Sequence, residues 1–231
     1  MNTKRIRMPL DILMTILSII LMGGTVLFPN DRVHQILGMT LLVLWAVHVI
    51  LNRRWFGSLF KGRYAPHRIM QIVVNLGVLV CALLLMISGM MMAWFIPSEI
   101  VGGGLGFARI IHLIASHWYY VFMAFHIGLH ASMIARIATQ SSTSSTSQNS
   151  QNKLPSKKII PLRVICIFIS LYGVYAFITR GLWKYMFGLQ QFFFFDFERG
   201  YLLFAIDYLS ILVLFATMMH YAGKIKKQDC F

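Results

Sequence analysis

Long blocks of apolar residues alternate along the chain with short polar or basic stretches. Six of the apolar blocks have about the length that a helix needs to cross a bilayer. Turn-forming or charged residues separate them; Asn30 or Asp31 is suited to cap the second helix, and Pro66 to begin the third. The pattern predicts an all-α, polytopic membrane protein with transmembrane helices over about residues 10–28, 32–52, 67–95, 107–138, 159–177 and 200–221.

A polar segment of low complexity, residues 139–158, divides this pattern into two parts. It is rich in Ser, Thr, Gln and Asn and too poor in apolar residues to fold alone, which is typical of a flexible linker. Residues 1–138 are expected to form a core of four transmembrane helices, and residues 159–231 a C-terminal pair of helices. The aromatic stretch 180–200, between the last two helices, is expected to lie at a membrane interface.

Composition supports the membrane assignment and narrows the functional classes. Hydrophobic residues make up 58% of the chain and charged residues 12%, which leaves too little polar surface for a soluble globule. The formal net charge is +14, but Lys and Arg stand in short clusters beside the apolar blocks, a distribution that indicates membrane topology and not nucleic-acid binding. In a six-span topology, sixteen of the 21 Lys and Arg residues fall on the side of the N-terminus and five on the other. Both termini are therefore predicted to be cytoplasmic.

Cysteine usage excludes two kinds of site. None of the three cysteines belongs to a CxxC or CxxCH motif. Neither a zinc site nor covalent attachment of a c-type haem is therefore predicted.

Two of the predicted helices each carry a pair of histidines fourteen residues apart, namely His34 and His48, and His112 and His126. On an α-helix this interval corresponds to about 21 Å along the axis and a rotation of about −40°, so both histidines of a pair point to one side. The two helices run in the same direction in the predicted topology, which places His34 at the depth of His112 and His48 at the depth of His126. Four buried imidazoles without partners would each cost about 1–3 kcal/mol. Two bis-histidine haems, one near each membrane face, are the leading interpretation.

Residues beside the outer pair are compatible with a bound porphyrin. Gly38 lies one turn after His34, and Ala115 and Ser116 follow His112, so that a flat cofactor can approach the backbone. Arg109, three residues before His112, is suited equally to pairing with a haem propionate and to interfacial anchoring.

The inner ligand on the fourth helix is left open between two histidines. His130 lies eighteen residues after His112 and so on the same stripe of the helix, and it is nearer to the inner boundary than His126. His126 keeps the matched interval and is favoured as the ligand. His130 is then expected to lie close to that ligand, to a propionate or to a quinone. His117 points about 140° away from His112 and is not predicted to be a ligand.

Several short motifs resemble those of a known family: LDILMTIL, HQILG, HVILNRRW, LFKGRYAPHRI, ISGMMM, ARIIHLIASHW and HIGLH. They are similar to a family of bacterial membrane proteins grouped with flavinylation-associated b-type cytochromes and, more distantly, with ferric-reductase-like transmembrane domains. The resemblance covers about residues 5–138. It implies passage of electrons from the membrane quinone pool to flavin-bearing partners outside the cytoplasmic membrane. It also implies a four-helix haem core with ligands at His34, His48, His112 and His126, and with His130 in the HIGLH motif.

The chain departs from this family at His117, where members usually carry tyrosine. It has no GxGxxG nucleotide fingerprint, so flavin and nicotinamide are expected on partner proteins. The predicted function is that of a membrane di-haem b-type cytochrome with two non-covalent haem b groups, an electron-transfer subunit of a membrane oxidoreductase. One alternative is a metal or ion transporter that uses the histidines, although the only acids within the spans, Asp11 and Asp207, are too few for an evident ion path. The other is a non-redox membrane anchor or assembly subunit.

Overall fold

The computed structural model describes residues 3–61, 64–141, 156–198 and 200–228, and every regular element in this part of the chain is a helix. Four helices are long and apolar enough to cross a membrane: α2, α4, residues 104–131 of α6 and residues 200–224 of α9. The all-helical, transmembrane character predicted from the sequence is therefore confirmed. The long helices are α1 (Thr3–Leu21), α2 (Asp31–Leu51), α4 (Pro66–Met91), α6 (Gly104–Ser141), α7 (Ser156–Thr179) and α9 (Gly200–Gln228), and the short ones are η1 (Thr25–Leu27), α3 (Arg54–Ser58), α5 (Ser98–Val101) and α8 (Leu182–Met186).

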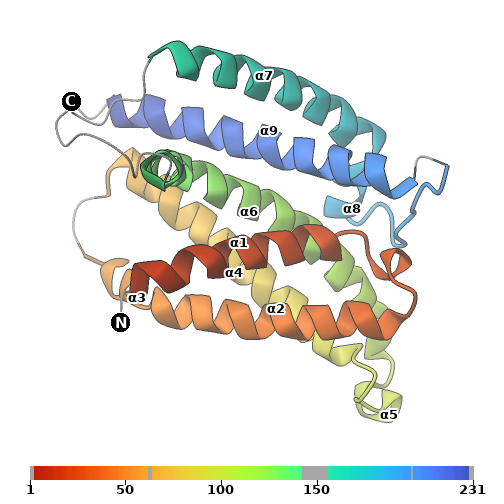
Figure 1. Cartoon of the computed structure of the whole chain (residues 1–231). Coiled ribbons are helices and arrows are strands. Elements are labelled where there is room, and N and C mark those ends of the chain that lie inside the picture. Colours follow the sequence, from red (N-terminus) through yellow and green to blue (C-terminus); the bar gives the residue numbers. More distant parts are fainter. Residues whose placement is uncertain (1–2, 62–63, 142–155, 199, 229–231) are drawn as a thin grey trace.

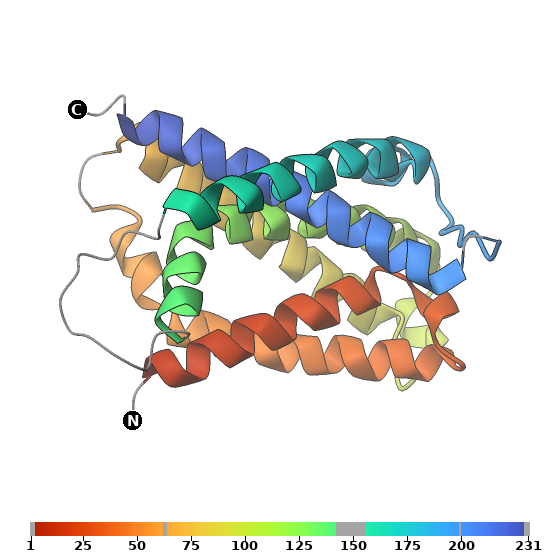
Figure 2. The same ribbon diagram turned by 45° about the horizontal axis from the view of Figure 1, so that its top comes forward.

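The long helices lie in three pairs, α1 with α2, α4 with α6, and α7 with α9 (Figures 1 and 2). Successive long helices run in opposite directions, so α2 and α6 run in the same direction (Figure 1). Contacts are extensive between α4 and α6, between α6 and α9 and between α7 and α9, whereas α2 meets α4 only sparsely. The α1–α2 pair is therefore the more loosely attached side of the molecule.

The ends of the helices follow local sequence signals. The side chain of Asn30 accepts a hydrogen bond from the backbone N–H of Arg32 and caps α2, and Pro66 stands at the start of α4. The first helix differs from the prediction, since it spans Thr3–Leu21 and not residues 10–28. Gly24, with φ of 63°, turns the chain after α1, and only a short 3₁₀ turn follows before α2.

The predicted linker, residues 139–158, is shortened at both ends. Helix α6 continues to Ser141 and α7 begins at Ser156. Residues 142–155 lie outside the described residues.

Close helix packing joins the C-terminal pair to the rest of the molecule. A Cβ atom on Gly128 of α6 would overlap with the backbone of Ala216 on α9, and one on Gly173 of α7 would overlap with the backbone of Ser210 on α9. Small residues at these crossings let helix backbones approach closely, as in other membrane helix pairs.

We expect Gly128→Ala to destabilise the protein by about 1–3 kcal/mol, because the added methyl group must push α6 away from α9. The midpoint of SDS-induced unfolding of the detergent-solubilised protein measures this loss. Gly106→Ala is the control, since it lies on the same helix and no atom lies within 4 Å of its added Cβ. Equal stability of the two variants would contradict the close approach of α6 and α9.

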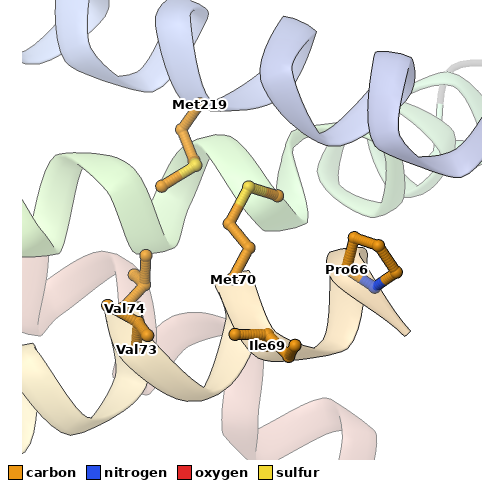
Figure 3. A pocket seen from close by; sticks show the side chains of 6 residues that line it. All are labelled: Pro66, Ile69, Met70, Val73, Val74 and Met219. Carbon is orange, nitrogen blue, oxygen red and sulfur yellow. The ribbon is translucent and has the colours of Figure 1, made fainter. Parts of the chain in front are cut away.

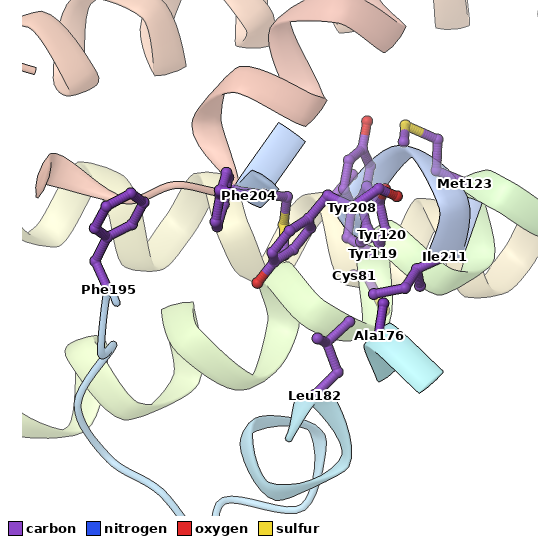
Figure 4. Close-up of a cluster of buried hydrophobic side chains, with 12 residues drawn as sticks. Cys81, Tyr119, Tyr120, Met123, Ala176, Leu182, Phe195, Phe204, Tyr208 and Ile211 are labelled. Carbon is purple, nitrogen blue, oxygen red and sulfur yellow. The ribbon is translucent and has the colours of Figure 1, made fainter. Parts of the chain in front are cut away.

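One core cluster connects α4 and α6 to the C-terminal helices (Figure 4). In it the rings of Phe204 and Tyr208 lie side by side, with centroids 4.3 Å apart, and the hydroxyl of Tyr120 donates to the backbone oxygen of Tyr208. The buried members of the cluster are Met22, Cys81, Ala82, Tyr119, Tyr120, Met123, Ala176, Leu182, Phe195, Phe204, Tyr208 and Ile211.

The aromatic stretch 180–200 is partly buried against the helices, which the sequence did not predict. It forms α8, which begins after Gly181 (φ 63°), and its residues Leu182, Tyr185, Met186 and Phe195 are buried. The indole N–H of Trp118 on α6 donates to the carbonyl oxygen of Met186 at 2.9 Å, which holds the segment against α6. Exposed aromatic rings, as an interface would require, remain at Phe187, Phe192, Phe194 and Phe197.

Two shallow hollows have apolar linings. One, of about 310 Å³, lies between α4 and α9, where Met70 and Met219 extend towards each other (Figure 3). The other, of about 370 Å³, lies along α4 and α6 and includes Cys81, Ala115 and Trp118. Since both linings are apolar, neither hollow offers the polar groups that would orient a substrate.

Candidate functional site

Two of the four predicted ligands face each other across the space between α2 and α6. The rings of His34 and His112 have centroids 6.4 Å apart and an interplanar angle of 66°. With metal–nitrogen bonds of about 2.0 Å, two imidazoles on opposite sides of one metal atom have centroids about 6 Å apart. The centroid distance of this pair is therefore close to that of two imidazoles that share one metal atom.

The ring of His112 contacts Ser88 and Gly89 of α4. The Ser88 hydroxyl donates to the carbonyl oxygen of Leu84 at 2.6 Å, so its oxygen can accept from Nδ1–H of His112, 3.1 Å away. A Cβ on Gly89 would lie 3.4 Å from Cε1 of His112, an ordinary contact distance, so the ring lies directly against α4. This arrangement leaves Nε2 of His112 as the ligating nitrogen, with its tautomer set by Ser88.

The surroundings of His34 fit a bound porphyrin in part. Nδ1 of His34 is buried without a hydrogen-bond partner among the described residues, a state that costs about 1–3 kcal/mol. Around the position of a Cβ on Gly38, one turn further along α2, no described atom lies within 4 Å, which is compatible with a porphyrin there. Ala115 differs from the expectation, since it is buried in the hollow between α4 and α6.

At the inner end of α2, His48 is held by a residue of α1. Its Nδ1 lies 2.7 Å from Oδ1 of Asp11, and the two form an ion pair if the imidazole is protonated. The amide of Asn52 donates to the backbone oxygen of His48 at 2.9 Å and lies 3.4 Å from Nε2, at the long end of hydrogen-bond geometry. Asp11 thus occupies the Nδ1 side of the ring and leaves Nε2 for a ligand.

His126 on α6 has a partner on α4 in the same way as His112. Nδ1 of His126 lies 2.8 Å from Oδ1 of Asn75, which accepts from it. The ring of His130 lies next to it, with centroids 4.8 Å apart. Both rings interact electrostatically with His48 and Asp11, so these groups form one inner cluster. Among the described ring contacts none joins His48 to His126, in contrast to the outer pair.

Arg109 and His117 are the other two residues of α6 that the sequence singled out. Arg109, which suits a haem propionate or interfacial anchoring, is exposed. His117 is only 1% exposed and stacks on Tyr185 of α8, with centroids 4.6 Å apart, while its Nδ1 donates to the backbone oxygen of Leu113 at 2.8 Å. It faces away from His34, as the sequence spacing predicted.

The sequence did not predict that Asp207 is buried together with two hydrogen-bond donors near the C-terminal helix pair. Asp207 of α9 is 2% exposed and accepts hydrogen bonds from Nε of Arg180 at 2.7 Å and from the hydroxyl of Tyr172 at 2.6 Å. The sequence marked Asp207 as an acid within a span, but gave no signal for its two partners. Because both carboxylate oxygens are occupied, this group is built as a structural ion pair.

Other kinds of site were sought in the same part of the chain. The described residues contain no group of three or more His, Cys, Asp or Glu side chains arranged to hold a metal ion. A haem needs only two protein ligands, so this observation does not bear on it. Comparison of the chain with protein-family models, with curated proteins and with solved structures found no match.

Proposed function

We propose that the protein is a di-haem b-type cytochrome of the bacterial cytoplasmic membrane. It carries electrons from quinol to a flavin-bearing or other acceptor on the extracytoplasmic side. The observation that carries this proposal is the pair His34 and His112, with ring centroids 6.4 Å apart on two helices that run in the same direction. The motifs that resemble those of flavinylation-associated cytochromes also support it, because they contain the same histidines.

The proposed topology has six spans with both termini in the cytoplasm. Four helices already have the length and apolarity of spans. Helix α1 packs along α2, and α7 packs along α9, so both neighbours are placed to complete the count. The division of Lys and Arg residues, sixteen against five, sets the orientation.

Each of the four histidines has a defined task in this proposal. His34 and His112 hold the outer haem and His48 and His126 the inner one, each through one ring nitrogen. Bound haem supplies a reversible one-electron carrier at each level. The apolar helices around the histidines keep water away, and the partners on Nδ1 fix the ring orientation and tune the ligand.

A reduced-minus-oxidised spectrum of membranes containing the protein tests the proposal, together with the number of haems per chain. We expect a b-type band, two haems per chain and no bound haem in the quadruple variant with leucine at positions 34, 48, 112 and 126. The variant His67→Gln, which changes a histidine at the start of α4, is the control and should keep both haems. A wild-type protein without a b-type band would refute the proposal, as would full haem content in the quadruple variant.

The inner ligand can be identified by two single variants. We expect His126→Leu to lose one haem and His130→Leu to keep both, because Asn75 orients the His126 ring. Haem content per chain measures the difference. The reverse result would assign the ligand to His130.

A metal transporter is the second candidate, because the inner cluster joins the carboxylate of Asp11 to the imidazole of His48. Such a protein would bind a divalent metal in the absence of haem. Metal content of the purified protein, measured beside its haem content, separates the two functions.

A further inference from the structure

We propose that Asp11 is a positioning residue for His48 and gives the inner haem level the lower reduction potential of the two. This inference rests on the proposed function. It assigns a task to α1, whose described residues include no histidine, and it sets the direction in which electron transfer is downhill.

The geometry places Asp11 directly on the non-ligating side of His48. Oδ1 of Asp11 lies 2.7 Å from Nδ1 of His48, a distance typical of a charge-assisted hydrogen bond. The carboxylate can only accept, so Nδ1 carries the proton and Nε2 keeps its lone pair for the metal. Arg7, one turn earlier on α1, donates to the backbone oxygen of Leu51 at 2.7 Å, and no ion pair between Arg7 and Asp11 occurs among the described residues.

The partners of the other oriented histidines are neutral. Ser88 accepts from His112 at 3.1 Å, and Asn75 accepts from His126 at 2.8 Å. A carboxylate partner makes an imidazole a stronger electron donor than a hydroxyl or an amide does, and thereby favours the oxidised metal. Of the three Nδ1 partners, only the inner one on α1 carries a charge.

Charged residues near the outer pair do not reproduce this effect. Asp31 interacts electrostatically with His34, but no hydrogen bond joins the two side chains among the described residues, and Nδ1 of His34 has no partner there. Asp11 is 52% exposed, as a charge at a helix surface is, but its carboxylate is in direct contact with the His48 imidazole. A carboxylate hydrogen-bonded to a ligand acts on the metal more strongly than a charge that is not in contact with it. The inner level would therefore have the lower potential, and with haem bound at both levels electron transfer from the inner to the outer level would be downhill.

A redox titration of the haem-loaded protein in membranes tests the inference. The two components are assigned by the variants His48→Leu and His112→Leu, which each leave one level. We expect the inner component to have the lower midpoint potential in the wild type, and Asp11→Asn to shift that component upwards, since asparagine keeps the shape and removes the charge. Asp11→Glu, which keeps the negative charge, should give an inner midpoint potential between those of the wild type and Asp11→Asn. Ser88→Ala is the matched control, expected to change the outer component alone.

Each outcome decides the matter. An upward shift of the inner component, or loss of the inner haem while the outer one remains, supports the positioning role of Asp11. An unchanged inner component in Asp11→Asn, an effect on the outer component only, or a wild-type inner component of higher potential overturns it. A wild-type protein without haem would refute the proposed function itself, so the two failures are distinguishable.

Discussion

Replacing His112 with leucine is expected to reduce the haem content from two groups per chain to one. In the proposed di-haem protein, the substitution would remove one of the two histidines that hold the outer haem and leave the inner histidines, about 21 Å away along the helix, untouched. Leucine has a comparable volume and suits the apolar surroundings, so the helices should keep their packing. Haem per polypeptide, measured by the pyridine haemochrome method, reports the loss directly.

Haem content also tests whether His34 and His112 bind the same haem. His34→Leu should remove the same haem, and the double variant should lose no more than either single variant, because both residues bind one group. His117→Phe is the control on α6, since His117 is a buried histidine of the same helix and its stacking on Tyr185 can be kept by a phenyl ring. Loss of both haems in the double variant, or of one in His117→Phe, would contradict the assignment of the outer level.

The pairing of His34 with His112 could be predicted from the sequence, because it depends only on the interval between histidines along each helix and on the direction of the two helices. Two pairs of histidines with the same interval predict equal depths on two helices that run the same way, and the structure brings His34 and His112 together. The position of His117 on a different side of α6 from His112, where it stacks on Tyr185, followed from the rotation per residue in the same way. Helical geometry is regular enough for such predictions to hold along one helix.

The partners on α4 and α1 were not predicted, because spacing along one helix does not say which neighbour covers it. One signal was available for α4: Asn75 and Ser88 are thirteen residues apart, close to the interval of fourteen on α6, and the two helices run in opposite directions. Polar residues at matching intervals on antiparallel helices meet in register. Asp11 gave a weaker signal, since α1 begins seven residues earlier than its predicted start at residue 10.

The burial of part of the aromatic stretch 180–200 was not predicted, for a different physical reason. Aromatic residues are favoured both at membrane interfaces and in protein cores, so composition does not separate the two locations. The difference arises from α8, which turns Tyr185 onto His117 and Met186 onto Trp118. Such contacts between distant segments depend on the packing of α6, which the local sequence of the stretch does not encode.

Replacing Asp207 with leucine is expected to lower the stability of the protein by about 3–5 kcal/mol. The side chains of Arg180 and Asp207 are 10% and 3% exposed, so the variant leaves a buried guanidinium group without its counter-charge. The hydroxyl of Tyr172 also loses its acceptor. The SDS concentration at the midpoint of unfolding measures the loss. Lys184→Met, which removes an exposed cation on α8, should change stability by less than about 0.5 kcal/mol.

A double-mutant cycle then separates the value of the ion pair from the cost of an unpaired charge. The variant with Arg180→Met and Asp207→Leu should recover most of the stability that either single variant loses, because no charge remains buried without a partner. Its recovery would show that Arg180 and Asp207 stabilise the contact of α7 with α9 mainly by neutralising each other. If the double variant instead loses as much as the sum of the single variants, the two side chains act independently, and the coupling inferred from their 2.7 Å contact is wrong.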